Sequence, residues 1–386
     1  MKLHVRLVAA AAAVGLVGAA LAGCGSSGGS SSSGDNITLG MVTPLTGSSA
    51  AIGPYMQNGA QLAINEINAK GGVLGKQLKL DVQDGACDAK SATTAANKLV
   101  SDKVAISVGG YCSGATLPTL PIFNNADIPM IIPAANSDEL VQQKLPLVFL
   151  INGTGTQQAN AAMKFIKKEG VKNVALMDDN TSYSVNIADL TEKLLKADSS
   201  GPKMAIHEHV TAGESDYSSN VNSVVKANPD FVYWTGYYQE GGLIIKQLRQ
   251  AGYTGKVMVA DGSVDAKLIA IAGNDNAQGV FATMTQTPDT IPGSEDWIAR
   301  YKKAFNADPG PYSTQAYDAV RVAAEGMTNA KSTDGKKVAT ALEAIDGMTL
   351  FSGPLKFTAD HTLSAGGFLI LVVNGDKFDV QDQLQD

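Results

Sequence analysis

The sequence contains few of the residues that catalytic and metal sites most often use. Only three cysteines and four histidines occur in 386 residues, and no CxxC pair or Cys/His spacing indicates a metal site. A Gly-rich phosphate loop is also absent, and no Ser or Cys stands in a convincing nucleophile–base pattern. We therefore expect no metal, no cofactor and no enzymatic activity.

Positive charge is scarce as well. The chain carries 30 Lys and Arg against 37 Asp and Glu, a net charge of −7. Nucleic-acid phosphates require clusters of Lys and Arg, and no such cluster occurs, so a nucleic-acid partner is not expected. Hydrophobic residues make up 44% and charged residues 17%, as in soluble globular proteins. Because a single core stops growing near ~250–300 residues, the length predicts two lobes.

Long apolar runs are missing except at the N-terminus. Residues 7–22 contain only Leu, Val, Ala and Gly and follow Lys2 and Arg6. This run is too short for a comfortable transmembrane helix, and a positive start with a small-residue end is typical of a signal peptide. Leu21-Ala22-Gly23-Cys24 at its end resembles a bacterial lipobox, in which the Cys is lipidated. We expect a lipoprotein signal peptide at 1–23, cleaved before a lipid-bearing Cys24.

The segment after the signal predicts where the protein resides. Residues 24–36 form a tether in which 25–34 are all Gly or Ser, with a reach of roughly 15–20 Å. The diacylglyceryl group of a lipoprotein supplies the two acyl chains that stable anchoring needs. We therefore expect the protein to be located on the outer face of the cytoplasmic membrane or in the periplasm. The remaining Cys87 and Cys112 are an even pair in an oxidising compartment, which predicts a disulfide.

From residue 37 onward, strand and helix patterns alternate with short connections. Such alternation predicts parallel sheets covered by helices, in two runs at about 37–150 and 155–285. The strands are expected at 37–43, 77–83, 105–108, 129–133, 148–151, 173–177, 204–210, 231–234, 257–260 and 280–284. The tail differs, with helices expected at 295–305, 317–329 and 336–345, and two strands, 353–357 and 368–373, around a turn near Asp360-His361.

Five short motifs, in their order and spacing, resemble the leucine/isoleucine/valine-binding protein family of ABC importers over about residues 37–380. The motifs are Asn65–Gly72, Asp84–Asp88, Cys112-Ser113, Ile132–Ala135 and Asp230–Tyr233. The resemblance implies the type I periplasmic-binding-protein fold, an α/β fold of two doubly wound Rossmann-like lobes with parallel sheets joined by a three-crossover hinge. It also implies a Cys87–Cys112 bridge. The implied lobes are 37–154 plus about 286–365, and 155–285 plus about 366–386.

The family resemblance implies a cleft that holds a free amino acid, whose carboxylate and ammonium need partners of opposite kind when buried. Ser113 follows a strand and opens a helix, where hydroxyls, N–H groups and the helix dipole favour a carboxylate; a plain N-cap is the alternative. Ala134, Ala135 and Asn136 end another strand, where ligands of parallel sheets bind. The family usually has Thr at the position of Asn136.

The ammonium requires a carboxylate, which the family supplies as Glu. The matching residue is Asp261, 24 residues after Tyr237 as in the family. Asp is one methylene shorter, so the ligand must sit deeper or a water must bridge. The alternative is an Asp that caps the next helix. Tyr183 and Tyr237 match two family tyrosines that close over the ligand.

The side-chain pocket and the partners follow from the same resemblance. Ile52 replaces a family aromatic, and Tyr111 and Tyr312 are further candidates for the pocket wall. An aliphatic wall suits valine, isoleucine, leucine or alanine. The protein would be a monomer that delivers its ligand to a membrane permease. The alternatives are the same fold binding an amide, urea or an aromatic acid, and a sensor or receptor component.

Two further groups of polar residues have ordinary explanations in the sequence. Glu240 and Asp178-Asp179 are expected to be solvated loop acids. His207 and His209 lie two apart on a strand and therefore face the same way. Without a third ligand nearby in sequence, a half-exposed strand face is favoured over a metal pair.

Overall fold

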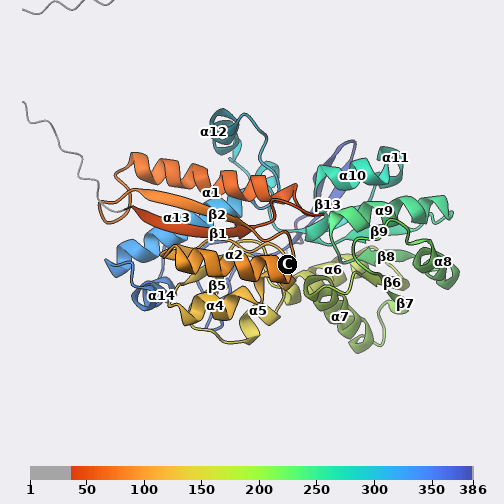
Figure 1. The fold of residues 1–386 in the computed structure, drawn as a ribbon. Coiled ribbons are helices and arrows are strands. Elements are labelled where there is room, and N and C mark those ends of the chain that lie inside the picture. Colours follow the sequence, from red (N-terminus) through yellow and green to blue (C-terminus); the bar gives the residue numbers. More distant parts are fainter. Residues whose placement is uncertain (1–35, 385–386) are drawn as a thin grey trace, which may run out of the picture. The chain divides into compact units, whose positions relative to one another are not determined.

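The computed structural model describes residues 36–384, so the expected signal peptide and Cys24 lie outside the described part. Its first sheet has five parallel strands in the order β2-β1-β3-β4-β5. In this sheet β1, next to the middle, is the first strand of the chain (Figure 1). The strands are β1 (Ile37–Thr43), β2 (Leu78–Asp84), β3 (Ile106–Ser107), β4 (Met130–Ile132) and β5 (Val148–Leu150).

The second sheet has seven strands in the order β14-β13-β10-β9-β8-β6-β7. Strands β6 to β10 are parallel, whereas β13 runs antiparallel to both β10 and β14. The strands are β6 (Asn173–Asp178), β7 (Lys203–His209), β8 (Phe231–Trp234), β9 (Lys256–Val259), β10 (Phe281–Met284), β13 (Leu369–Asn374) and β14 (Lys377–Asp382).

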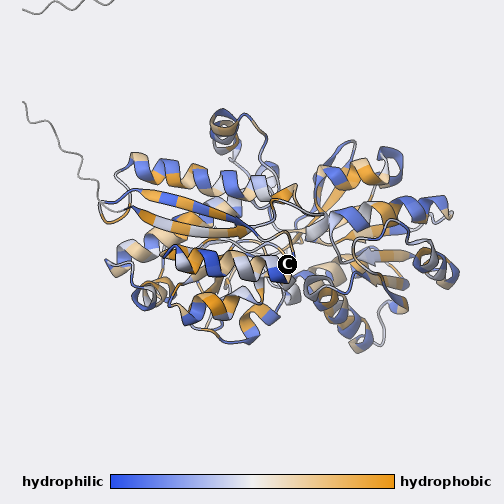
Figure 2. Ribbon diagram, viewed as in Figure 1, coloured by the Kyte–Doolittle hydropathy of each residue, from blue (hydrophilic) through white to orange (hydrophobic). Residues whose placement is uncertain are grey.

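Helices follow most strands and pack against the sheets, with apolar and polar colours alternating along them (Figure 2). Those packed with the first sheet and its surroundings are α1 (Ile52–Ala69), α2 (Ala89–Ser101), α3 (Ser113–Thr116), α4 (Thr119–Asn125), α5 (Glu139–Gln142), α12 (Glu295–Phe305), α13 (Ser313–Ala330) and α14 (Gly335–Glu343). Those packed with the second are α6 (Gly155–Lys168), α7 (Ser182–Ala197), α8 (Ser218–Ala227), α9 (Tyr238–Gln250), α10 (Ala266–Ala272) and α11 (Asn274–Ala277).

Local chemistry explains where several of these helices begin. Asp88 and Asp265 accept backbone N–H bonds as N-caps of α2 and α10, and Thr154 forms a capping box with Gln157 at the start of α6. Helices α1 and α13 approach closely because Gly59 has no side chain: a Cβ there would lie 2.0 Å from the Ser313 carbonyl oxygen. In the described residues, no helix combines the length and apolarity needed to cross a bilayer.

The predicted alternation is confirmed for the ten strands from β1 to β10, within a few residues at each end. The predicted pairing of 353–357 with 368–373 is wrong, although the second segment is a strand, β13, and a turn does lie at His361, between the bridged residues Phe357 and Leu363. Gly353–Pro354 (β12) pairs instead with Thr349–Leu350 (β11), and β13 turns at Gly375 to pair with β14. The two-residue loop is Gly375-Asp376, a hairpin signal with Gly at the first position, and Gly375 has the positive φ of 68° that such a turn needs.

Candidate functional site

Asp261 is the centre of a buried polar cluster. It follows β9, opens a short 3-10 helix, η1 (Asp261–Ser263), and is 2% exposed. Its carboxylate accepts hydrogen bonds from the Tyr183 hydroxyl at 2.5 Å, the Tyr312 hydroxyl at 2.7 Å and Gln158 Nε2 at 2.8 Å, with Asn136 Nδ2 at 3.4 Å. All four donors are neutral, and in the described part of the chain Asp261 has no ion-pair partner.

Burial without a cation changes the acidity of this carboxyl group. Desolvation raises the pKa of Asp261, and the hydrogen bonds from Tyr183, Tyr312 and Gln158 lower it by less. A buried carboxylate is costly unless a positive charge lies beside it. Among the described residues, the negative charge of Asp261 is met by neutral hydrogen-bond donors only.

Residues from both sheets meet at this carboxylate. Asn136 follows β4 of the first sheet, whereas Gln158 lies on α6 and Tyr183 on α7 beside the second. The Asn136 side chain also donates to Gln158 Oε1 at 2.8 Å, and Gln158 Nε2 donates to Thr283 Oγ1 on β10 at 2.9 Å. The sequence did not single out Gln158, although a polar residue on the apolar face of α6, beside Ala159 and Ala162, was a usable signal.

Ser113 lies in the same region and is fully buried. Its Oγ accepts the N–H groups of Asn136 at 3.3 Å and Ser137 at 3.2 Å, whereas the N-cap position of α3 is Cys112, so the alternative of a plain N-cap does not hold. The helix it opens, α3, is a single turn, so the dipole on which its prediction relied is small. The hydroxyl itself is the feature that could serve a carboxylate.

The main chain at Ala134–Asn136 is largely engaged within the protein. The Ala134 carbonyl accepts from Asn152 Nδ2 at 2.7 Å, and the Ala135 N–H donates to the Gly110 carbonyl at 3.1 Å. The Asn136 carbonyl accepts from the Gly155 N–H at 2.7 Å. By contrast, Asn136 Oδ1 is buried with no partner among the described residues. The free polar capacity at this strand end therefore includes the Asn136 side chain.

Four tyrosines, Tyr111, Tyr183, Tyr237 and Tyr312, surround Asp261 and are called the tyrosine cluster below. Their ring centroids lie 5.8 Å apart for Tyr111–Tyr237, 5.4 Å for Tyr111–Tyr312 and 4.9 Å for Tyr183–Tyr237. The Tyr111 hydroxyl donates to the Gly262 carbonyl at 3.3 Å. The Tyr237 hydroxyl lies near the Ser113 backbone but completes no hydrogen bond in the described structure. Ile52, the remaining predicted pocket residue, is buried at the start of α1.

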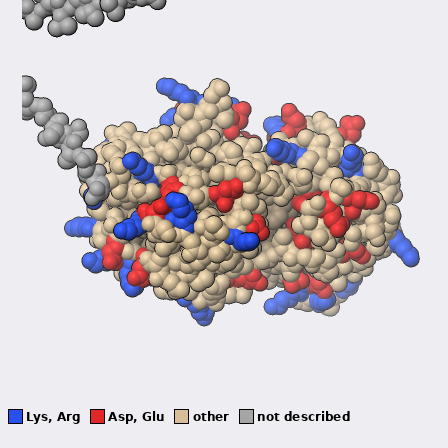
Figure 3. Space-filling view, in the orientation of Figure 1, with Lys and Arg blue, Asp and Glu red and all other residues tan. Residues whose placement is uncertain are grey.

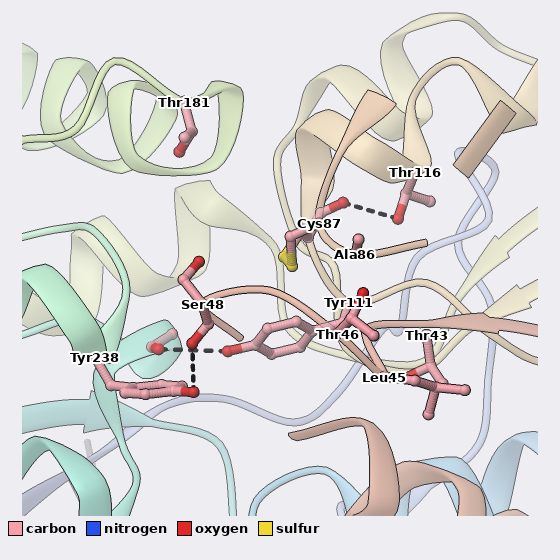
Figure 4. The surroundings of a disulfide bond; sticks show 12 residues. Thr43, Leu45, Thr46, Ser48, Ala86, Cys87, Tyr111, Thr116, Thr181 and Tyr238 are labelled. Carbon is pink, nitrogen blue, oxygen red and sulfur yellow. Dashed lines mark hydrogen bonds between the residues drawn. A yellow bond between two sulfur atoms is a disulfide. The ribbon is translucent and has the colours of Figure 1, made fainter. Parts of the chain in front are cut away.

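Direct contacts join the segments that carry these residues. The Tyr238 hydroxyl at the start of α9 donates to the Ser48 carbonyl at 2.5 Å (Figure 4). Ser182 Oγ at the start of α7 donates to Glu139 Oε2 on α5 at 2.8 Å, and the Asp138 N–H donates to Asn186 Oδ1 at 3.2 Å. These contacts cross between the two sheets and enclose the cluster, whose members are at most 9% exposed.

The predicted disulfide is confirmed between Cys87 and Cys112, with Cα atoms 5.4 Å apart. Cys87 lies in the loop after β2 (Figure 4), and Cys112 directly precedes Ser113 after β3. The bridge therefore connects two loops at the carboxyl edge of the first sheet and restrains the residue next to Ser113.

The expectation that Asp178, Asp179 and Glu240 are solvated is wrong, because they are 0%, 2% and 3% exposed. Each has a specific donor: Asp179 accepts from Thr181, Glu240 accepts from the Gly213 N–H at 3.0 Å, and Asp178 meets His207 and His209. Burial raises the pKa of both Asp179 and Glu240.

On the face of the molecule shown in Figure 3, Lys and Arg are interspersed with Asp and Glu.

A two-sheet α/β protein whose strand ends enclose a buried acid and several hydroxyls has the features of a small-molecule binding protein. The chain belongs to the periplasmic binding protein family, whose sequence profile matches residues 36–377. The fold is the type I periplasmic-binding-protein fold, as the resemblance implied.

Relatives and solved structures agree with this membership. Over 312 residues the chain is 36% identical to the leucine-, isoleucine-, valine-, threonine- and alanine-binding protein of Pseudomonas aeruginosa, covering 80% of this chain and 83% of that protein. It is 35% identical to the leucine-specific-binding protein of Salmonella typhimurium, covering 89% and 92%. The structure of the branched-chain amino acid transporter substrate-binding protein LivJ of Streptococcus pneumoniae in complex with isoleucine superposes with a TM-score of 0.81 at 25% identity, covering 89% and 98%.

Proposed function

We propose that the chain is the extracytoplasmic substrate-binding component of an ABC importer and binds a free amino acid, branched-chain or small aliphatic. The observation that carries the proposal is Asp261, a buried carboxylate that four neutral donors contact and that no cation among residues 36–384 neutralises. An α-ammonium group beside it would supply the missing charge. Two relatives, at 36% and 35% identity, are named for binding leucine and similar amino acids.

The other end of the amino acid would meet the groups that still have hydrogen-bonding capacity. The Ser113 hydroxyl and the Tyr237 hydroxyl can donate to a carboxylate, and Asn136 Oδ1 can accept from the ammonium. Charge-assisted hydrogen bonds contribute about 1.5–3 kcal/mol each. Three or four of them would therefore sustain tight binding of a zwitterion. None of this requires bond-making chemistry, so the proposed role is binding and delivery rather than catalysis.

Delivery would depend on movement of the two sheet-bearing lobes, which we place at 37–154 plus about 286–365 and 155–285 plus about 366–386. A ligand that contacts Ser113 on one side and Asp261 on the other shifts the equilibrium toward the closed form. A permease would recognise that form. We also propose that the protein is a monomer anchored by a lipid on Cys24, outside the described residues.

The proposed cargo is tested by thermal unfolding with a panel of ligands. Leucine, isoleucine, valine and alanine are expected to raise the melting temperature, because a ligand at 100 times its Kd stabilises the folded state by about 2.7 kcal/mol. Benzoate, urea and simple amides are expected to have no effect, because none brings a cation to Asp261. A melting-temperature increase with benzoate and none with any amino acid would instead assign an aromatic acid as the cargo.

Two tyrosines of the cluster are expected to respond differently to loss of their hydroxyl. Tyr237→Phe removes a buried hydroxyl without a partner, so the ligand-free protein should keep or gain up to about 1 kcal/mol of stability, while amino-acid affinity falls about 10-fold. Tyr183→Phe removes a hydrogen bond to Asp261 and should destabilise the ligand-free protein by about 1 kcal/mol. Urea unfolding and calorimetric titration measure both quantities. Equal destabilisation by the two variants would contradict the assignment of the Tyr237 hydroxyl.

A further inference from the structure

Three side chains outside the tyrosine cluster converge at the edge of the second sheet. Strands β6 and β7 pair in parallel with Asp178 opposite His209 and Leu176 opposite His207, so both imidazoles lie beside the carboxylate that ends β6. His207 Nε2 and His209 Nδ1 each lie 2.7 Å from the same oxygen, Asp178 Oδ2. The two rings have centroids 4.4 Å apart. The neighbouring strand, β6, therefore supplies Asp178 as the third possible metal ligand, which is not near the two histidines in the sequence.

These three side chains are held in place by other contacts. Asp178 Oδ1 accepts the Asn180 N–H at 2.9 Å, which leaves Oδ2 facing the histidines. On the far side of the His207 ring, Nδ1 lies 2.8 Å from Glu192 Oε2 on α7. Asp178 is fully buried, the His207 side chain is 9% exposed and the His209 side chain is 52% exposed. The cluster is therefore ordered on its inner side and open to solvent at His209.

We propose that Asp178 Oδ2, His207 Nε2 and His209 Nδ1 form a site for a divalent transition metal, with Zn²⁺ as the best match. Two imidazole nitrogens and one carboxylate oxygen are ligands that Zn²⁺ prefers, and solvent at the exposed side supplies a fourth. His207 Nδ1 lies against Glu192 Oε2 and would keep its proton there, while the proton between Nε2 and Asp178 Oδ2 would leave when the metal binds and free the Nε2 lone pair. This carboxylate–histidine–metal arrangement is the usual second shell of zinc sites.

The spacing of the three atoms is compatible with this ion after a small adjustment. Ligand atoms at about 2.0–2.1 Å from a tetrahedral metal lie roughly 3.3–3.4 Å from one another, whereas the two nitrogens now lie 2.7 Å from Asp178 Oδ2. An outward shift of about 0.6 Å, derived from those bond lengths, would open the site. His209, being half exposed, can move that far by itself, whereas the His207–Asp178 spacing opens only if these two buried side chains shift apart by the same amount.

A second grouping shares one member and must be distinguished. Asp189, Glu192 and His207 also bring one possible ligand atom each within 4.8 Å of one another. That group would use His207 Nδ1 and exposed Asp189. On that side His207 Nδ1 already lies against Glu192 Oε2, and the Glu192 carboxylate also pairs with Lys196. We therefore assign the metal to the Asp178 side of the ring.

The test measures Zn²⁺ binding to the purified protein, prepared with a histidine-free affinity tag and stripped with a chelator. Competition against a chromophoric zinc indicator gives the affinity and stoichiometry, and Co²⁺ gives an absorption spectrum that reports nitrogen and oxygen ligation. His209→Ala is the main variant, because its side chain is half exposed and the fold should tolerate the change. Asp189→Asn is the matched control, and Glu192→Gln tests the second shell.

We expect one Zn²⁺ per chain and a higher melting temperature with Zn²⁺. His209→Ala should lose more affinity than the roughly 10–100-fold expected for Glu192→Gln, while Asp189→Asn stays unchanged. No binding at 100-fold excess over micromolar protein, or equal affinity in His209→Ala, would overturn the proposal. Loss in Asp189→Asn with retention in His209→Ala would move the site to the other face of His207 and equally overturn it. Amino-acid binding, measured separately, does not enter this result.

Discussion

Replacement of Asp261 by asparagine is expected to weaken amino-acid binding by about 10²–10³-fold. The variant keeps the size of the side chain and removes its charge, so the ligand ammonium would be buried without a counter-ion. Breaking a buried ion pair costs about 3–5 kcal/mol, and each 1.4 kcal/mol is a factor of ten in affinity. Isothermal titration with leucine or isoleucine at neutral pH measures the loss.

The same substitution is expected to leave the ligand-free protein as stable as before, or more stable. Burial raises the pKa of Asp261, so the folded state binds its proton more tightly than the unfolded state does. Stability contributed by this group therefore falls as the pH rises from the ordinary pKa through the raised one. Amino-acid affinity should change in the opposite sense, weakening as the pH falls through the raised pKa. Asp261→Asn should remove the Asp261 contribution to both pH dependences, whereas the contributions of Asp179, Glu240 and Asp265 to stability remain.

Asp265→Asn is the matched control for the charge change. Asp265 lies four residues further along the same segment, is 4% exposed, and has a pKa that burial raises. It caps α10 through the Lys267 N–H at 2.8 Å, a role that Asn fills equally well. Its replacement should therefore leave leucine affinity within a few-fold. An undiminished affinity in Asp261→Asn, or an equal loss in both variants, would contradict the proposed ammonium site.

Much of the candidate site could be predicted because strand ends are visible in the sequence. Ser113, Asn136 and Asp261 each follow a run of apolar or β-branched residues, and the carboxyl ends of parallel strands share one edge. That rule brings together Ser113 and Asn136, which follow strands of the first sheet, whereas Asp261 follows β9 of the second, and only the family resemblance implied that the two edges face one cleft. Gln158 was not predicted, because it lies on a helix, α6, rather than at a strand end, and it contacts Asp261 across 103 residues of sequence.

The predictions that proved wrong concern residues whose burial, or strands whose pairing, depends on a partner distant in the sequence. Asp178 was expected to be solvated because a charged residue after a strand usually is. The register of β6 with β7 instead places it against His207 and His209, 29 and 31 residues away. Periodicity gives a strand but not its neighbour, so this register could not be read from either strand alone. The misplaced hairpin near His361 has the same origin, since β13 pairs with β10 far back in the chain.

Removal of the disulfide by the double substitution Cys87→Ser/Cys112→Ser is expected to lower the free energy of unfolding by about 3–4 kcal/mol in the chain-entropy model. The sequence separation of 25 residues sets this value, because the bridge restricts the unfolded chain. The disulfide also restrains the folded state. Ala86 and Cys87, at one end of the bridge, both have positive φ values, 48° and 53°, which non-glycine residues rarely adopt. Urea unfolding with linear extrapolation measures the loss.

The disulfide variant should also bind amino acids less tightly, because Cys112 directly precedes Ser113 and fixes the loop that presents its hydroxyl. Treatment of the unsubstituted protein with a thiol reductant should reproduce the lower stability, and the same reductant should have no effect on the double variant. If the reductant destabilised both proteins equally, the effect would not come from the bridge. If both proteins unfolded at the same urea concentration before reduction, the bridge would contribute nothing, and the left-handed turn at Ala86 and Cys87 would be held by other contacts. These include the hydrogen bonds from the Ala86 N–H to Asp84 Oδ1 and from the Asp88 N–H to the Gly85 carbonyl.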